Sequence, residues 1–116
     1  MTDRDRGTTL LFTRNGMGQA DPALSQKLAG SYLDLLDLED RLPATICFYA
    51  EGVKLACEGS PVLETLSGLA ERGVTLLVCT TCLQFFDLEA RLAVGEAGNM
   101  RQIQAAQWDA GKVISL

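Results

Sequence analysis

Two cysteines that follow a strongly apolar segment are the residues of this chain best suited to chemistry. Residues 74–78 are aliphatic and β-branched, and they have the length of a buried strand. Cys79 ends the segment, and Cys82 follows after Thr80 and Thr81. A thiol at the carboxyl end of a buried strand, beside a helix start, is where α/β proteins tend to place reactive groups. We therefore predict Cys79 and Cys82 to be the catalytic residues.

The spacing of the two cysteines is compatible with both a functional and a structural role. If a helix starts near Thr80, the free N–H groups of its first turn stabilise a thiolate on Cys79. Cys82 then lies about one turn further, on a similar side of the helix, which permits a disulfide or a relay between sulfurs. In the alternative, both are small apolar residues packed under the helix. A CxxC spacing is short and does not decide between these roles.

The chain contains no histidine, and this excludes several kinds of site. A Cys-His nucleophile pair, a Ser-His-Asp triad and a histidine-containing zinc site all require it. Cys47 and Cys57 are ten positions apart, so a four-cysteine zinc site is not expected, and we predict Cys47 to be a core residue. The glycines of residues 16–18 lack the third glycine of a dinucleotide fingerprint, and no Walker A residues are present. We expect neither a metal nor a cofactor.

Size and charge restrict the class of protein further. A chain of 116 residues suits one domain, and a net charge of −5 argues against a nucleic-acid partner. No apolar run approaches the ~20 residues of a membrane span, and the amino terminus is polar. Unpaired cysteines are typical of reducing compartments. We therefore expect a soluble, cytoplasmic protein without a membrane partner.

The pattern of apolar residues predicts strands that alternate with helices. Strands are expected at residues 8–13, 44–49, 74–79, 92–94 and 111–116. Helices are expected from 22 to about 39, 53 to 57, 61 to about 71, 83 to 88 and 100 to about 109. In the first helix, apolar residues follow helical spacing at Leu24, Leu28, Tyr32, Leu35 and Leu36. This alternation predicts a three-layer α/β/α sandwich with a mainly parallel five-stranded sheet. Residues 1–7 are expected to be a loose leader to a single domain at 8–116.

In such sheets the loops at the carboxyl ends of the strands lie together and form the site. Those loops are predicted at residues 14–20, 50–54, 79–82 and 95–99. Lys54 is the only lysine in them, so it is the natural cation to lower a thiol pKa, although a solvated surface lysine is an equal alternative. The residues predicted to line the site or to stabilise the thiolate are Asn15, Gly16, Met17, Gly18, Gly52, Lys54, Thr80, Thr81, Gly95 and Asn99.

Several short motifs, in one order, resemble the DsrE-like family. The resemblance is strongest to the DsrE-like domain of YedF-type proteins, which are sulfurtransferase-like and linked to selenium metabolism. The matching stretches are Asn15-Gly16-Met17-Gly18 with Asp21, Phe48-Tyr49, Gly52-Val53-Lys54-Leu55, Glu58-Gly59-Ser60-Pro61-Val62-Leu63, Cys79-Thr80-Thr81-Cys82-Leu83, Ala93-Val94-Gly95-Glu96, Asn99-Met100 and Gly111-Lys112-Val113-Ile114. They cover nearly the whole chain from Thr8 onward. Thr80 stands where that branch usually has glycine.

The resemblance implies a DsrE-like fold and assembly into a homo-oligomer, a trimer or hexamer. In sulfur-relay members a cysteine at the end of the third strand accepts sulfur as a persulfide, and the matching residue is Cys79. Cys82 matches a second cysteine of the YedF-like branch. A TusA-like domain often accompanies that branch, so a TusA-like donor or acceptor is expected here as a separate polypeptide.

Three functional hypotheses follow. The first is a carrier that accepts sulfur, or selenium, on Cys79 and relays it to a partner protein, with Cys82 as resolving or second-carrier thiol. The second is a thiol–disulfide redox module that uses the same pair. The third is a non-catalytic oligomeric binding module in which both thiols are packed.

Overall fold

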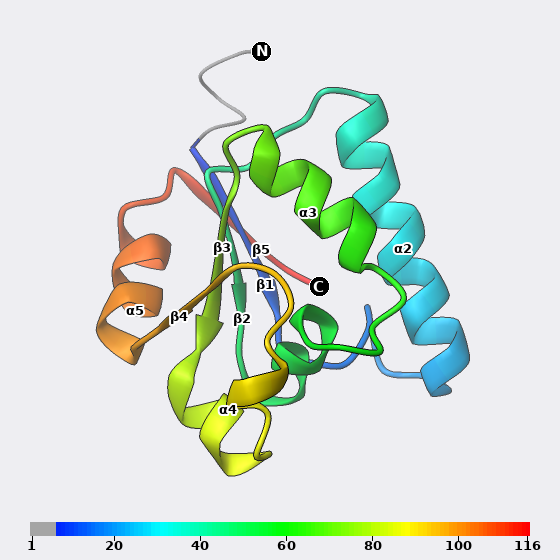
Figure 1. Cartoon of the computed structure of the whole chain (residues 1–116). Helices are drawn as coiled ribbons and strands as arrows, with labels where there is room; N and C mark the ends of the chain where they lie inside the picture. Colours follow the sequence, from blue (N-terminus) through cyan, green and yellow to red (C-terminus); the bar gives the residue numbers. More distant parts are fainter. Residues whose placement is uncertain (1–6) are drawn as a thin grey trace.

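The computed structural model describes residues 7–116, and its centre is a five-stranded sheet in which every pairing is parallel (Figure 1). The order across the sheet is β4-β3-β2-β1-β5. The strands are β1 (Thr8–Phe12), β2 (Thr45–Phe48), β3 (Thr75–Cys79), β4 (Glu96–Gly98) and β5 (Lys112–Ser115). The predicted parallel sheet is confirmed, and strands β1, β2, β3 and β5 lie within the predicted ranges.

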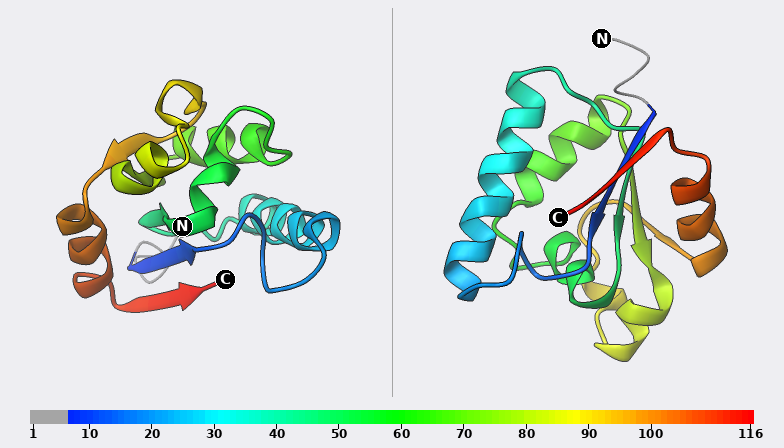
Figure 2. Two further views of the ribbon diagram at one scale, coloured as in Figure 1. Left: turned by 90° about the horizontal axis from the view of Figure 1, so that it is seen from below. Right: turned by 180° about the vertical axis from the view of Figure 1, so that it is seen from behind.

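The helices form the outer layers of the predicted three-layer sandwich. They are α2 (Pro22–Leu38), α3 (Leu63–Glu71), α4 (Thr80–Phe85) and α5 (Met100–Trp108), with 3₁₀ helices η1 (Ala50–Ala56) and η2 (Glu89–Arg91). α2 and α3 cover one face of the sheet and α5 covers the other (Figure 2). α4 and η1 lie against each other at the carboxyl ends of β2 and β3. The edge where the site was predicted is therefore built by these two short helices.

The core lies on both faces of the sheet, and it explains why the strands are almost continuously apolar. All five residues of β1 are buried, and the Phe12 and Phe48 rings stack with centroids 5.7 Å apart. Strands covered on both faces cannot alternate with polar residues. Thr9 is a buried exception, and its hydroxyl donates to the Ala106 carbonyl of α5 at 2.9 Å. That bond removes the cost of burying an unsatisfied hydroxyl.

Local sequence signals determine where α2 and α5 begin. Asp21 caps α2 by accepting from the Ala23 N–H at 2.9 Å, with Pro22 in the first turn, as predicted. Asn99 caps α5 and forms a reciprocal pair with Gln102, each side chain bonding to the other's backbone N–H at 2.9 Å. Both start sites are thus confirmed.

α2 departs from the prediction in which of its residues it buries. Ser25, Ala29 and Leu33 face the core, with Tyr32 and Leu36 partly buried. Three leucines that the spacing had grouped with the buried face are exposed instead: Leu24, Leu28 and Leu35. The helix is apolar on two faces, and periodicity alone cannot say which of two stripes meets the sheet.

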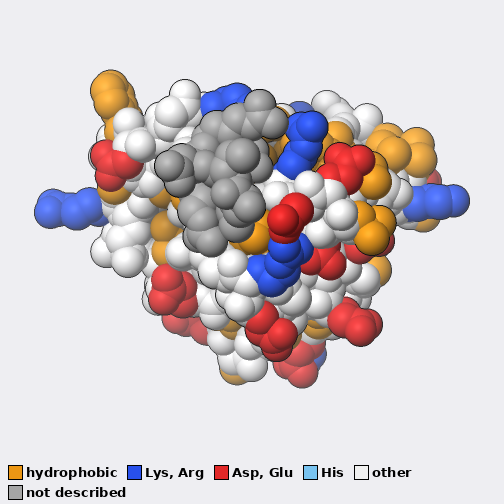
Figure 3. All heavy atoms as spheres, turned by 90° about the horizontal axis from the view of Figure 1, so that it is seen from above, with side chains coloured by type: hydrophobic (Ala, Val, Ile, Leu, Met, Phe, Trp, Pro, Cys, Tyr) orange, Lys and Arg blue, Asp and Glu red, His pale blue; other side chains and the backbone are white. Residues whose placement is uncertain are grey.

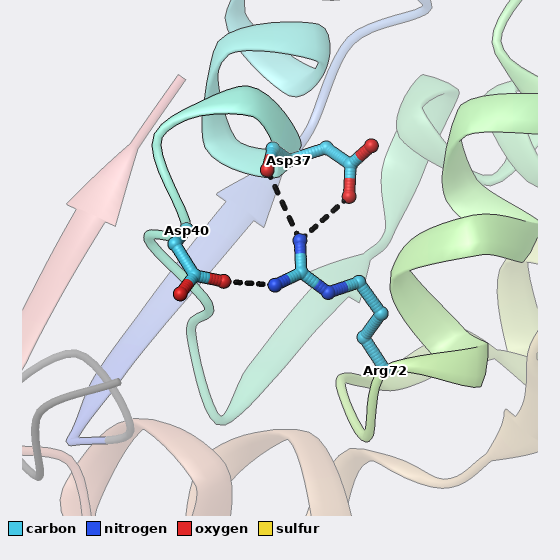
Figure 4. A network of polar contacts seen from close by, with 3 residues as sticks. All are labelled: Asp37, Asp40 and Arg72. Carbon is cyan, nitrogen blue, oxygen red and sulfur yellow. Dashed lines mark hydrogen bonds and ion pairs between the residues drawn. The ribbon is translucent and has the colours of Figure 1, made fainter.

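An arginine at the end of α3 ties the carboxyl ends of α2 and α3 together (Figure 4). The Arg72 guanidinium donates to the Asp37 carbonyl at 3.0 Å, to the Asp37 carboxylate at 2.7 Å, and to the Asp40 carboxylate. Hydrogen bonds to Asp37, then to Asp40, raise the pKa of Arg72. The group is exposed, so we assign it a role in helix alignment rather than a large share of stability.

The predicted fourth strand is wrong in position. Residues 92–94 form no ladder; Ala93 and Val94 both donate to the Ala56 carbonyl, and only Leu92 makes an isolated bridge, to Cys57. The strand is β4, which was predicted as a loop. It pairs with β3 from Leu77 to Cys79 despite a Glu-Ala-Gly sequence of low strand propensity. Apolar side chains at 92 and 94 serve partial burial against the core instead.

Two further predictions concern the ends and the environment of the chain. The predicted leader at 1–7 lies outside the described residues except for Gly7, whose carbonyl accepts from the Gly111 and Lys112 N–H groups. None of the helices in residues 7–116 combines the length and apolarity needed to cross a membrane.

Cys47 is fully buried in β2, as predicted. Its burial makes the free energy of unfolding vary with pH in the alkaline range. Burial raises the pKa of the thiol from 9.0 to about 11. The folded state retains the proton after the unfolded chain has lost it, so the stabilisation is complete below pH 9 and is lost as pH rises toward 11. We expect Cys47→Ala to flatten this decline by roughly 2 kcal/mol between those limits. Urea unfolding at several pH values measures it, and parallel profiles for parent and variant would contradict it.

Candidate functional site

The two predicted cysteines meet where β3 passes into α4. Cys79 is the last residue of β3 and the N-cap of α4, which begins at Thr80 and ends at Phe85, short of the predicted end at residue 88. Cys79 is only 1% exposed, whereas Cys82, one turn along α4, is half-buried. Both thiols are free. The pair therefore has an inner member and an outer member, a distinction that the sequence did not reveal.

The outer thiol is held by a backbone group from the neighbouring strand end. The Ala50 N–H donates to the Cys82 sulfur at 3.1 Å. Burial raises the pKa of Cys82, a hydrogen bond with Cys79 raises it further, and the Ala50 N–H acts in the opposite direction. Because its pKa is raised, Cys82 is predominantly a protonated thiol at neutral pH.

Ala50 is the site residue that sequence reasoning missed. It follows β2 and begins η1 with φ of 52°, a left-handed conformation that is uncommon for a residue with a Cβ. Such conformations cost about 1–3 kcal/mol and cluster at functional sites. Here the conformation accompanies an N–H directed at the Cys82 sulfur. An alanine side chain carries no signal of this role, because the contributing group is the backbone.

Lys54 lies at this edge of the sheet, but its contacts are with groups other than the thiols. Its ammonium is 2.6 Å from a Glu51 carboxylate oxygen and 4.6 Å from the centre of the Phe86 ring. Neither sulfur is among the contacts found for it in residues 7–116. A cation over an aromatic ring contributes about 0.5–1 kcal/mol at exposed sites. Lys54 thus links η1 to Phe86, the C-cap of α4.

Thr80 and the last residue of β4 join the site to the sheet edge. The Thr80 hydroxyl donates to the Gly98 carbonyl at 3.0 Å, while Thr81 is exposed. Thr80 is not among the described residues with positive φ, so a threonine where YedF-type proteins usually have glycine imposes no backbone strain there. Asn99 follows β4 as predicted, but its side chain caps α5.

The loop of residues 14–20 packs on the start of α2 rather than on the cysteines. The Met17 N–H donates to the Ser25 carbonyl at 2.9 Å, and the Ser25 hydroxyl donates to the Gly18 carbonyl at 3.3 Å. A Cβ on Gly16, whose φ is 153°, would lie 2.5 Å from the Ser25 Cβ. Glycine is therefore required there for packing.

Two hollows open beside this loop, and Asn15 and Lys54 line both of them. One, of about 260 Å³, also includes Cys57 and Ser60. The other, of about 340 Å³, also includes Arg14, Ser25 and Glu51. Neither Cys79 nor Cys82 lines them. The predicted site residues thus divide into a thiol pair and a separate polar cleft at the same sheet edge.

Two of the glycines predicted to line the site are instead required by close packing against neighbouring strands. Gly95 precedes β4, and a Cβ there would lie 2.9 Å from the Leu76 Cβ and carbonyl oxygen, three positions before Cys79. Gly95 therefore lies at the amino end of β4, opposite the carboxyl ends that form the site. It was expected after the fourth strand because that strand was predicted at residues 92–94. Gly52 is buried in η1 against the Phe12 carbonyl. Within residues 7–116, no three acidic or cysteine side chains lie close enough to hold a metal ion.

Comparisons with known proteins inform the fold more than the chemistry. No protein-family model matches the chain, and no curated protein matches it in sequence. Protein MTH1491 from Methanobacterium thermoautotrophicum, of unknown function, has a similar structure, with a TM-score of 0.69 and 17% sequence identity. The match covers 94% of this chain and 97% of that one. The ychN protein from E. coli is also similar, with a TM-score of 0.66 and 15% sequence identity; the match covers 94% of this chain and 98% of that one. At such identities the likeness shows the fold alone. The chain has the DsrE-like α/β/α fold that the sequence resemblance implied.

Proposed function

We propose that this chain carries sulfur, or selenium, as a persulfide on the Cys79–Cys82 pair and relays it to a partner protein. The observation that supports this most is the pairing of a buried and a half-exposed free thiol at the carboxyl end of β3. The resemblance to YedF-type proteins points to the same two residues. It also makes a TusA-like protein the candidate donor or acceptor.

The burial of the two thiols favours a division of roles that differs from the one predicted from sequence. Cys79, predicted as the acceptor, is almost inaccessible, so a bulky protein donor reaches Cys82 first. Cys79 then takes the sulfur from Cys82 and stores it away from solvent thiols. Thiolate attack requires access to the sulfur and no general base, which fits a chain without histidine.

The transfers balance without a cofactor. The Cys82 thiolate attacks the terminal sulfur of the donor's persulfide; a new S–S bond forms, the donor's S–S bond breaks, and the donor leaves as a thiolate. The Cys79 thiolate then attacks the terminal sulfur on Cys82, and Cys82 leaves as a thiolate that takes up a proton. The Ala50 N–H, 3.1 Å from the Cys82 sulfur, stabilises the charge that develops there.

Intact-mass measurement after incubation with a persulfide donor tests the proposal. We expect the parent to gain sulfur atoms, and Cys79→Ala/Cys82→Ala to gain none. Cys47 is a buried core thiol outside the pair, so Cys47→Ala is the matched control and should load as the parent does. Loading of the double variant at the parental rate would refute the proposal.

A redox module is the second candidate, because both free thiols lie within one turn of each other at the start of α4. It predicts that an oxidant converts the pair to a disulfide, with loss of two hydrogen atoms, at a defined reduction potential. The same mass measurement separates the two candidates. A gain of sulfur from the persulfide donor, measured without added reductant, supports the carrier, and a disulfide without any gain of sulfur supports the redox module.

A further inference from the structure

α2 carries an exposed leucine stripe on the side away from the core. The stripe comprises Leu24, Leu28, Leu35 and Leu38, which are 49%, 44%, 51% and 79% exposed, with Ser31 exposed at its centre. The steps between these positions are four, three, four and three residues. This is the spacing of a helical seam that packs against a second helix. In Figure 3, hydrophobic side chains gather on the side of the molecule where Figure 1 places α2.

The remaining sides of α2 already have partners. Ser25, Ala29 and Leu33 face the core. On another side, Asp34 accepts from the Thr65 hydroxyl of α3 at 2.8 Å, and Asp37 binds Arg72. Residues 7–116 of the same copy leave the stripe open to solvent. An apolar seam on a 17-residue helix is therefore available to another molecule.

We propose that the leucine stripe binds the same stripe of a second copy, with the two α2 helices antiparallel across a two-fold axis at Ser31. Leu24 and Leu38 lie seven residues on either side of Ser31, and Leu28 and Leu35 lie three and four residues from it. An antiparallel pair places Leu24 opposite the second copy's Leu38, and Leu28 opposite its Leu35. The small Ser31 side chains meet at the axis, where they let the two backbones approach closely.

Charge complementarity favours this arrangement over a parallel one. Lys27 and Asp34 flank the stripe on one side, and their midpoint lies within one residue of Ser31. Antiparallel packing brings Lys27 beside Asp34 of the second copy, twice per pair, because a two-fold contact is reciprocal. In a parallel pair the two charges are about 10 Å apart along the axis, from a rise of about 1.5 Å per residue. Asp34 can accept from both Thr65 and Lys27, since a carboxylate has several acceptor positions.

The contact involves mainly one helix from each copy, so it falls at the small end of specific interfaces and should dissociate on dilution. It is independent of the cysteine chemistry, because the stripe lies on α2 and the thiols lie at β3 and α4. A two-fold contact makes a numerical prediction: where it is the contact that joins the two halves of the assembly, breaking it divides the mass by two.

Sedimentation equilibrium of the full chain, with reductant present, tests the interface at concentrations up to about 100 µM, where a contact with a dissociation constant of about 40 µM is populated. We expect Leu28→Ser/Leu35→Ser to halve the parental mass without lowering the unfolding temperature, since both side chains are exposed in the single copy. Trp108→Ser is the control: Trp108 is 82% exposed on α5, outside the stripe, and its loss should leave the mass unchanged. A monomeric parent, or a leucine variant with the parental mass, overturns the proposal.

A charge exchange tests the antiparallel register. Lys27→Glu and Asp34→Lys should each weaken association by roughly three- to tenfold, and the double variant should regain most of that loss. Asp34→Lys also removes the bond to Thr65, so the unfolding temperature of each variant is measured beside its mass. A double variant that associates no better than the weaker single variant rules out the register.

Discussion

Cys82→Ser is expected to slow sulfur loading from a protein-bound persulfide by at least about tenfold, whereas Cys79→Ser should still load. The reason is access: the attacking thiolate must approach in line with the donor's S–S bond, and Cys79 is 1% exposed. Quenched-flow mass measurement with a protein donor gives both rates. The sulfur on Cys79→Ser should also be lost faster to an added small thiol, because it remains on the outer residue.

This experiment distinguishes the two possible entry thiols. If Cys82→Ser loads at the parental rate while Cys79→Ser does not load, Cys79 is the entry thiol, as the sequence alone predicted. The pH dependence gives a second readout. Because burial and Cys79 raise the pKa of Cys82, its loading rate should still be rising at pH 9 rather than reaching a plateau below it.

Gly52→Ala is expected to lower the free energy of unfolding by roughly 3–5 kcal/mol, or to prevent folding. A Cβ at this position would lie 1.9 Å from the Phe12 carbonyl oxygen and 2.6 Å from its carbon. These are backbone atoms of β1, so they cannot rotate away as the end of a side chain can. Urea unfolding measures the loss.

Gly68→Ala is the matched control for this substitution. Gly68 lies within α3, and a Cβ there meets no atom within 4 Å. Alanine is the better helix former, so this variant should be more stable by about 0.5–1 kcal/mol. A Gly52→Ala protein within about 1 kcal/mol of the parent would show that η1 shifts easily away from β1.

The Gly52 substitution also reports on the site. η1 presents the Ala50 N–H to Cys82, so a displaced η1 removes the group that lowers the pKa of that thiol. If the variant folds, alkylation of Cys82 at pH 8 should be slower than in the parent. This links a packing glycine, predicted as a site residue from its place in a loop, to the chemistry through the backbone.

Much of the architecture is determined by short-range patterns that the sequence shows directly. Apolar runs of strand length predicted β1, β2, β3 and β5, because strands covered on both faces must be apolar throughout. Asp21 with Pro22, and Asn99, predicted two helix starts, because a cap acts on N–H groups only a few residues away. The position of Cys79 at the end of β3 follows from the same local reasoning.

What only the tertiary structure decided depends on contacts between distant segments. β4 exists because Glu96–Gly98 lies beside β3, and its own residues have little preference for a strand. The direction of Lys54 toward Phe86, and the choice of which α2 stripe meets the sheet, likewise depend on what packs nearby. For the thiols, the sequence by itself determined which two residues sit at the end of β3. Only the assembled structure shows that Cys82 is the outer thiol and Cys79 the inner one, because burial is a property of the packed layers. The hydrogen bond from the Ala50 N–H to Cys82 likewise requires η1 to be in place.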